Sequence, residues 1–208
     1  MKPELQTLAF SIYTICLSKN IDFSVAWVPR EQNVEADLVS KVFDFDDWTV
    51  SNHIFSFFNT VWGPYTCDIF ASCNNFKVNK FYSLFWTPGT SGVDAFAFDW
   101  SQDVNWIVPP ISLIGRAVRH LLNCGAKGTL VVPKWKSAAF WPSLIDKNGK
   151  FLWFVKDSIE YKHPTIFFVP GSDKNSIFAA QKFNSNVIAL NLDASFEVII
   201  MLFIYMNS

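Results

Sequence analysis

The stretch at residues 105–133, NWIVPPISLIGRAVRHLLNCGAKGTLVVP, has the pattern of a strand, a helix and a second strand. Residues 105–108 predict a short strand, and the two prolines that follow end it because proline cannot donate to a sheet ladder. Residues 112–122 carry apolar side chains at helical spacing, and Gly125 suits the left-handed position that closes a helix. Residues 128–133 are nearly all apolar, as buried parallel strands are. The stretch therefore predicts two parallel strands joined by a crossover helix.

The alternation continues on both sides of this stretch. Helices are predicted over residues 52–61 and 138–145. Further strands are predicted at residues 68–71, 151–155, 165–169 and 187–192. Strands that alternate with helices indicate a mostly parallel sheet with helices on its faces. We therefore expect an α/β fold with a Rossmann-like, mostly parallel sheet.

Composition bounds the class of protein. The chain has 208 residues, of which 50% are hydrophobic, so it can build a real core and is not disordered. Its net charge of −1 gives no basic field, so nucleic acid would have to bind a local patch. The four cysteines form no CxxC pair and the three histidines are far apart, which argues against a zinc site. Unpaired thiols favour a cytoplasmic or nuclear location.

The chain divides into three parts by sequence pattern. An acidic linker begins at residue 43, so we place one domain at residues 1–42 and a second at residues 43–195. Residues 196–208 form an atypical apolar tail. The apolar run in this tail is shorter than the roughly 20 residues that a membrane helix needs, so we expect no membrane contact.

The first part has the pattern of a helix (residues 4–19), a strand (residues 23–27) and a second helix (residues 34–42). With the segment WVPREQNVEADLVS at residues 27–40, this order resembles the end of the ribonuclease-H-like domain of reverse transcriptases. The resemblance places Asp37 at the family's last metal-ligand position, in a site that uses two divalent ions. The family's other carboxylates precede this region, so Mg²⁺ is expected only in an intact domain. Asp37 could equally be a solvated residue near a helix N-terminus.

The second part carries a succession of short motifs. They are CDIFAS at residues 67–72, DAF at 94–96, DW at 99–100 and NWIVPP at 105–110. This order resembles the segment that follows ribonuclease H in DIRS-type retrotransposons, which is similar to the Dam and phage-type adenine-N6 DNA methyltransferases. The resemblance implies that S-adenosylmethionine binds at the carboxyl edge of the sheet, near Asp68 and Asp99. It also implies that Pro109 and Pro110 are what remains of a catalytic motif that receives a flipped adenine.

The catalytic motif departs from the family pattern on both sides of the prolines. The family has a polar residue before them and an aromatic residue after them, whereas this chain has Val108 and Ile111. Val108 cannot accept a hydrogen bond through its side chain, and Ile111 has no ring to stack on a base. Both contacts that would favour the transition state are therefore missing. The two prolines could equally be a plain strand stop, and Asp68 and Asp99 could equally cap turns.

A second group of residues could contact nucleic acid. Lys134, Trp135 and Lys136 follow the strand at residues 128–133, and Arg116 lies on the preceding predicted helix. Interleaved cations and aromatic rings can bind single strands by phosphate contact and base stacking. The alternative is that Trp135 belongs to the core and that Arg116 belongs to a solvated helix face.

These patterns lead to one expected function and two alternatives. We expect a retrotransposon-derived polyprotein fragment that acts on nucleic acid, DNA or an RNA–DNA hybrid, with upstream segments of the parent element. Alone it would be catalytically incomplete. The first alternative is an S-adenosylmethionine-dependent adenine-N6 DNA methyltransferase with an altered active site. The second is a non-enzymatic module that binds nucleic acid or a protein.

Overall fold

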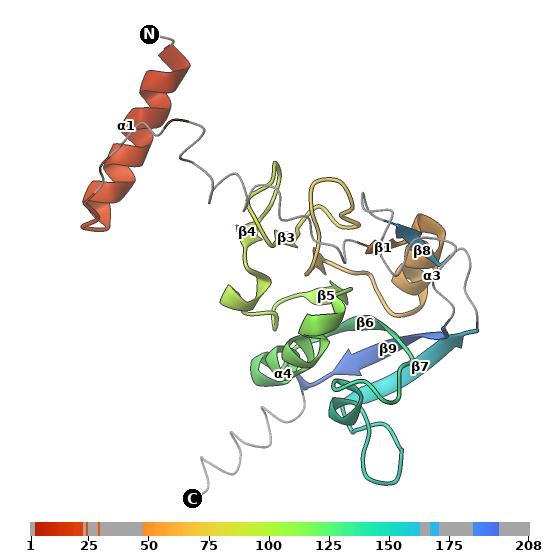
Figure 1. The fold of residues 1–208 in the computed structure, drawn as a ribbon. Coiled ribbons are helices and arrows are strands. Elements are labelled where there is room, and N and C mark those ends of the chain that lie inside the picture. Colours follow the sequence, from red (N-terminus) through yellow and green to blue (C-terminus); the bar gives the residue numbers. More distant parts are fainter. Residues whose placement is uncertain are drawn as a thin grey trace, which may run out of the picture. The chain divides into compact units, whose positions relative to one another are not determined.

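The computed structural model describes residues 3–22, 24, 29, 48–162, 167–170 and 185–195 (Figure 1). The chain forms two compact units, Met1–Phe43 and Asp44–Ser208, and each is described by itself. The predictions for Asp37, for the helix at residues 34–42 and for the tail at residues 196–208 lie outside the described residues, as does most of the strand predicted at residues 23–27.

In the first unit, the helix predicted over residues 4–19 is confirmed as α1 (Pro3–Ser18). The side-chain hydroxyls of Ser11, Thr14 and Ser18 each donate to a main-chain carbonyl one turn earlier in the helix. Large apolar side chains such as Phe10 and Leu17 are exposed on this helix. Among the described residues, none of the helices has both the length and the apolar character that a membrane crossing requires.

The second unit is mixed α/β and is built on a five-stranded sheet (Figure 1). Its strands, in spatial order, are β2 (Cys67–Asp68), β5 (Val104–Ile107), β6 (Lys127–Pro133), β9 (Val187–Asp193) and β7 (Val155–Tyr161). Strands β2, β5 and β6 are parallel, whereas β9 is antiparallel to both β6 and β7. The prediction of a mostly parallel sheet is therefore wrong, because half of the strand pairs are antiparallel.

The two helices predicted on either side of β6 have different outcomes. A crossover helix, α4 (Ile114–Cys124), joins β5 to β6, and these two strands are parallel. The helix predicted at residues 138–145 is only the short 3₁₀ helix η3 (Trp141–Ser143), and Pro142 limits it. The described residues from 155 to 195 contain no α-helix of a crossover length. Of the two helices predicted in residues 112–145, only one is formed as an α-helix, so the regular alternation of strands and helices behind the prediction is broken after β6.

Four shorter strands lie beside this sheet. The segment predicted as a strand at residues 165–169 forms β8 (Phe168–Pro170), which pairs antiparallel with β1 (Trp48–Val50). Strands β3 (Tyr82–Ser83) and β4 (Gly92–Val93) pair in parallel, and η1 (Ala95–Ala97) follows them. The segment predicted as a strand at residues 151–155 is mostly a turn that leads into β7.

A parallel bridge between Asp68 and Phe81 places β3 next to β2. Two main-chain hydrogen bonds support it: the Asp68 N–H donates to the Lys80 carbonyl at 2.9 Å, and the Ala71 N–H donates to the Tyr82 carbonyl at 3.0 Å. The parallel segments therefore lie in the order β4, β3, β2, β5, β6. After β2, the chain first forms β3 and β4 on one side of β2. It then forms β5 and β6 on the other side, so the strand order reverses between β2 and β5.

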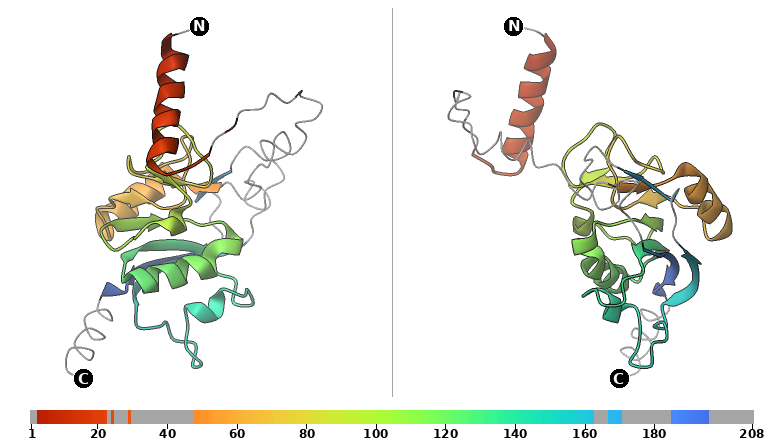
Figure 2. Two further views of the ribbon diagram at one scale, coloured as in Figure 1. Left: turned by 90° about the vertical axis from the view of Figure 1, so that its left-hand side faces the viewer. Right: turned by 45° about the vertical axis from the view of Figure 1, so that its right-hand side comes forward.

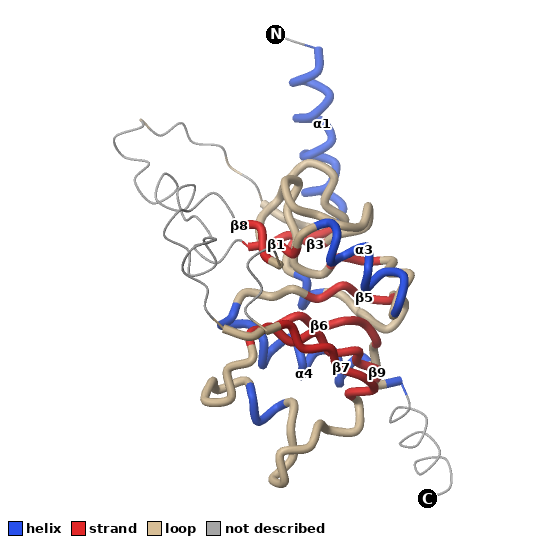
Figure 3. The backbone as a smooth tube through the Cα atoms, turned by 90° about the vertical axis from the view of Figure 1, so that its right-hand side faces the viewer, coloured by secondary structure: helices blue, strands red, loops and turns tan. Residues whose placement is uncertain are grey.

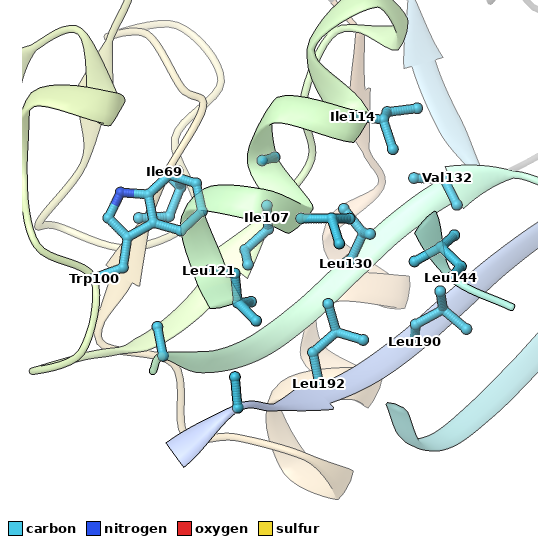
Figure 4. Packing of buried hydrophobic residues seen from close by; sticks show 14 of the residues in the cluster. Ile69, Trp100, Ile107, Ile114, Leu121, Leu130, Val132, Leu144, Leu190 and Leu192 are labelled. Carbon is cyan, nitrogen blue, oxygen red and sulfur yellow. The ribbon is translucent and has the colours of Figure 1, made fainter. Parts of the chain in front are cut away.

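Helices cover the two faces of the sheet. The helix α4 and the helix α3 (Asn52–Val61) lie on opposite sides of β5 and β6 (Figures 2 and 3). Successive strand residues alternate between the faces, as a pleated strand requires. The α4-side core includes Ile107, Leu130, Leu190, Ile114 and Leu121 (Figure 4). The α3-side core includes Trp106, Val131, Ala189, Ile54 and Phe58.

Strands β5 and β6 approach closely at Asn105 and Gly128, which are register partners. The Asn105 side chain is fully buried, and its amide nitrogen donates to the carbonyls of Trp100 (2.9 Å), Asp103 (3.2 Å) and Lys127 (2.8 Å). A Cβ atom on Gly128 would lie 2.2 Å from the Asn105 carbonyl oxygen. Glycine is therefore required here because two backbones meet without room for a side chain.

We expect Gly128→Ala to lower the free energy of unfolding by about 1 to 3 kcal/mol, since the added methyl group must displace the β5 backbone. Gly115→Ala is the matched control. A Cβ there meets nothing within 4 Å, and replacing a helical glycine by alanine stabilises by up to about 1 kcal/mol. Urea denaturation measures both variants. Equal stability of Gly128→Ala and the unmodified protein would contradict the close approach.

Candidate functional site

The candidate site is the edge of the sheet at which β2 and β5 end. In open α/β sheets, ligands bind outside the carboxyl ends of the strands at the point where the strand order reverses. Here that point lies between β2 and β5. We call residues 68–72, at the end of β2, and residues 108–111, at the end of β5, the carboxyl edge.

Asp68 is the ionisable group at this edge, and its side chain is buried. One carboxylate oxygen (Oδ2) accepts the main-chain N–H of Lys77 at 2.9 Å. Burial raises the pKa of Asp68 to about 7, although hydrogen bonds from the main chain of Lys77 and Phe70 and the nearby Lys77 ammonium act to lower it. At neutral pH the carboxyl is therefore divided between its protonated and ionised forms, and a cationic ligand would favour the ionised form.

Lys77 is the cation whose charge acts on Asp68, and sequence reasoning missed it. Its ammonium donates to Asn52 Oδ1 at 2.7 Å, and burial lowers the pKa of the Lys77 side chain. Nine residues separate Asp68 from Lys77 and no motif joins them, so the sequence held no signal for this pair.

The two prolines of the carboxyl edge are engaged in contacts within the protein. Pro109 is buried, and the Pro110 carbonyl accepts the Leu113 N–H at 2.9 Å at the start of η2 (Ile111–Leu113). Val108 is 7% exposed and belongs to the α3-side core, and Ile111 is half-buried against both cores. Both side chains therefore serve packing and bring no hydrogen-bond acceptor to the edge. Asn105 does not replace Val108, because its amide is engaged near the start of β5.

Asp99, the second predicted cofactor-binding residue, lies away from the carboxyl edge. It precedes β5, near the amino ends of the parallel strands, whereas Asp68 ends β2. Its carboxylate accepts the N–H and the hydroxyl of Ser101, both at 2.8 Å, and these hydrogen bonds lower the pKa of Asp99. The structure therefore does not bring the two predicted cofactor-binding residues together, and Asp99 shapes the turn before β5.

The predicted nucleic-acid residues mostly have partners within the chain. Lys134 forms an ion pair with Glu160. Trp135 is half-buried against the α4-side core and donates its indole N–H to Ser185 Oγ at 3.0 Å. The Arg116 guanidinium lies 3.8 Å from the centroid of the Phe96 ring. Lys136 is exposed. A ligand would have to displace most of these contacts.

Metal binding has no support in the part of the chain that the structure describes, where no group of three or more histidine, cysteine or carboxylate side chains could hold an ion. Asp37, the residue predicted as a metal ligand, lies outside that part. No protein-family model and no curated protein sequence matches the chain.

The raised pKa of Asp68 predicts a pH-dependent stability. The folded state binds this proton more tightly than the unfolded chain, whose aspartate pKa is about 4. The contribution is therefore fully present at low pH and is lost as the pH rises towards 7. From about pH 5 to about pH 8, we expect the unmodified protein to lose about 2 kcal/mol relative to Asp68→Asn, which cannot ionise.

Urea denaturation across this pH range measures the difference between the two proteins. Asp99→Asn is the control: the pKa of Asp99 lies below its usual range, so this variant should keep the slope of the unmodified protein. A constant difference between the unmodified protein and Asp68→Asn at every pH would contradict the buried, proton-binding carboxyl.

Proposed function

We propose that the unit Asp44–Ser208 binds S-adenosylmethionine at the carboxyl edge without transferring its methyl group. In this proposal the chain is a catalytically degenerate, methyltransferase-like module of a retroelement polyprotein that acts on nucleic acid. The observation that carries the proposal is the reversal of strand order between β2 and β5 with the Asp68 carboxyl buried at that point. The proposed ribonuclease-H-like segment adds Asp37, which needs the rest of its domain to hold Mg²⁺.

The donor side of the edge fits this cofactor. S-adenosylmethionine carries a sulfonium and an ammonium cation, and a buried carboxylate is a suitable partner for either. Two small residues, Ala71 and Ser72, lie three and four residues after Asp68. The sequence has no glycine between Gly63 and Gly89, so a glycine-rich loop for a diphosphate is missing. This favours a cofactor without phosphate groups. When bound, it would supply an activated methyl group.

The acceptor side does not fit a transferase. Methyl transfer to the adenine amine develops charge on that amine, and a hydrogen-bond acceptor stabilises it. Such a group lowers the barrier most when it is already fixed in position. Val108 and Ile111 instead pack into the cores. We therefore place this chain among binding modules and not among active transferases.

Calorimetric titration of the full chain with S-adenosylmethionine tests the donor site. We expect affinity to rise about tenfold from pH 6 to pH 8, because the cation binds the ionised form of Asp68 and one pKa unit is a factor of ten. At 100 times the dissociation constant, the ligand should stabilise the fold by about 2.7 kcal/mol. Asp68→Asn should lose this pH dependence, and Asp99→Asn should keep it. A folded protein that does not bind the cofactor would refute the proposal.

The loss of catalysis needs a separate assay. With methyl-labelled S-adenosylmethionine and adenine-containing single- and double-stranded DNA, we expect no transfer of label by the unmodified protein. Label in DNA would overturn the degenerate site and would favour an adenine methyltransferase with a different set of acceptor groups.

A further inference from the structure

A basic and aromatic loop follows η3 and includes the first two residues of β7, outside every site considered above. Its sequence, KNGKFLWFVK at residues 147–156, has three lysines and no acidic residue. Lys147, Lys150 and Lys156 are exposed, and Phe151 and Trp153 are 38% and 42% exposed. We call residues 147–156 the lysine–tryptophan loop. Asp146 and Asp157 flank the loop directly, so residues 146–157 carry a net charge of +1 in a chain whose net charge is −1.

Main-chain contacts fix the shape of this loop. Asp146 Oδ1 accepts the N–H groups of Asn148 (2.8 Å) and Lys150 (2.9 Å), so this carboxylate closes a turn. Ile145 and Phe151 form an antiparallel bridge. Gly149 has a φ of 77°, a conformation that glycine adopts without strain. The loop is therefore ordered before any ligand arrives, which lowers the entropy cost of binding.

Trp153 combines an aromatic surface with a nearby charge. The Lys156 ammonium lies 5.5 Å from the centroid of the indole ring and donates to the Trp153 carbonyl at 3.2 Å. Phe154, the next residue, is buried in the α4-side core and anchors this part of the loop. A partly exposed ring beside a fixed cation suits a ligand with both flat bases and negative charge.

The loop lies at the opposite end of the sheet from the carboxyl edge. Val155 is in register with Leu192, and Leu192 is in register with Gly128 near the start of β6. In Figure 1 the segment between η3 and β7 forms the loop at the lower end of the second unit. A ligand of this loop would therefore bind independently of the cofactor proposed for Asp68.

We propose that the lysine–tryptophan loop binds single-stranded nucleic acid, with Trp153 stacked on a base and Lys147, Lys150 and Lys156 on phosphates. The lysines favour a partner with phosphate groups. The exposed rings favour a single strand over a duplex, because the bases of a duplex are already stacked on one another. Trp86 offers the contrast. It is more exposed, at 75%, yet residues 84–91 contain no charged residue.

Fluorescence anisotropy of labelled single strands of about 12 nucleotides, as DNA and as RNA, tests the stacking. With the full chain, Trp153→Ala should weaken binding about 5- to 150-fold, the range of one base–aromatic stack. Trp153→Phe should keep most of the affinity because it retains a ring. Trp86→Ala is the matched control for general stickiness and should leave binding unchanged.

The salt dependence of binding tests the lysines. Each phosphate contact contributes about −0.7 to the slope of log K against log salt for a single strand, so Lys147→Ala with Lys150→Ala should reduce the slope by about 1.4. Lys19→Ala with Lys162→Ala removes the same charge from two exposed lysines outside the loop and should leave the slope unchanged.

Several results would overturn the proposal. An unchanged affinity of Trp153→Ala would exclude stacking, and an equal loss of slope in both lysine pairs would reduce the effect to overall charge. Duplex DNA bound as tightly as single strands, or anionic lipid vesicles bound more tightly than either, would assign the loop to another partner. Asp68→Asn should not alter this binding, so the loop and the cofactor site can fail separately.

Discussion

The buried amide of Asn105 is the contact on which the second unit depends. It links the turn before β5 to the first residue of β6, through the carbonyls of Trp100 and Lys127. Gly128 allows the two strands to approach closely enough for this contact. Because β5 and β6 are held in this register, the residues that alternate along them supply both cores. The ends of the same strands define the carboxyl edge and its opposite edge.

Local patterns predicted the local parts of this fold well. The apolar run at residues 128–133 is β6, and the helix predicted over residues 112–122 is realised as η2 and α4, closed by left-handed Gly125. The direction of β9 was not predictable, because antiparallel pairing with both β6 and β7 depends on contacts far apart in the chain. Strand direction has no periodicity of its own, so the mixed sheet could not be read from residue spacing.

The sites show the same division between local and distant information. Asp68 was found from its motif, but its burial and its contact with Lys77 were not. Lys134 looked free in sequence, yet its partner Glu160 lies 26 residues later. The apolar run at residues 151–155 predicts a strand, and that prediction does not reveal the partial exposure of Trp153. Exposure depends on what covers a side chain, which the neighbouring residues do not specify.

The outer position of β7 has a consequence for how the molecule behaves at high concentration. An outer strand exposes unpaired main-chain groups, which invite another chain to extend the sheet. Lys156, Asp157 and Glu160 are exposed along β7, so an incoming strand would have to approach charges of both signs. On the opposite side β4 is only two residues long. Among the strands that the structure describes, both outer ones are thus poor templates for growth of the sheet, a constraint that matters in a chain with 22 phenylalanines and 9 tryptophans.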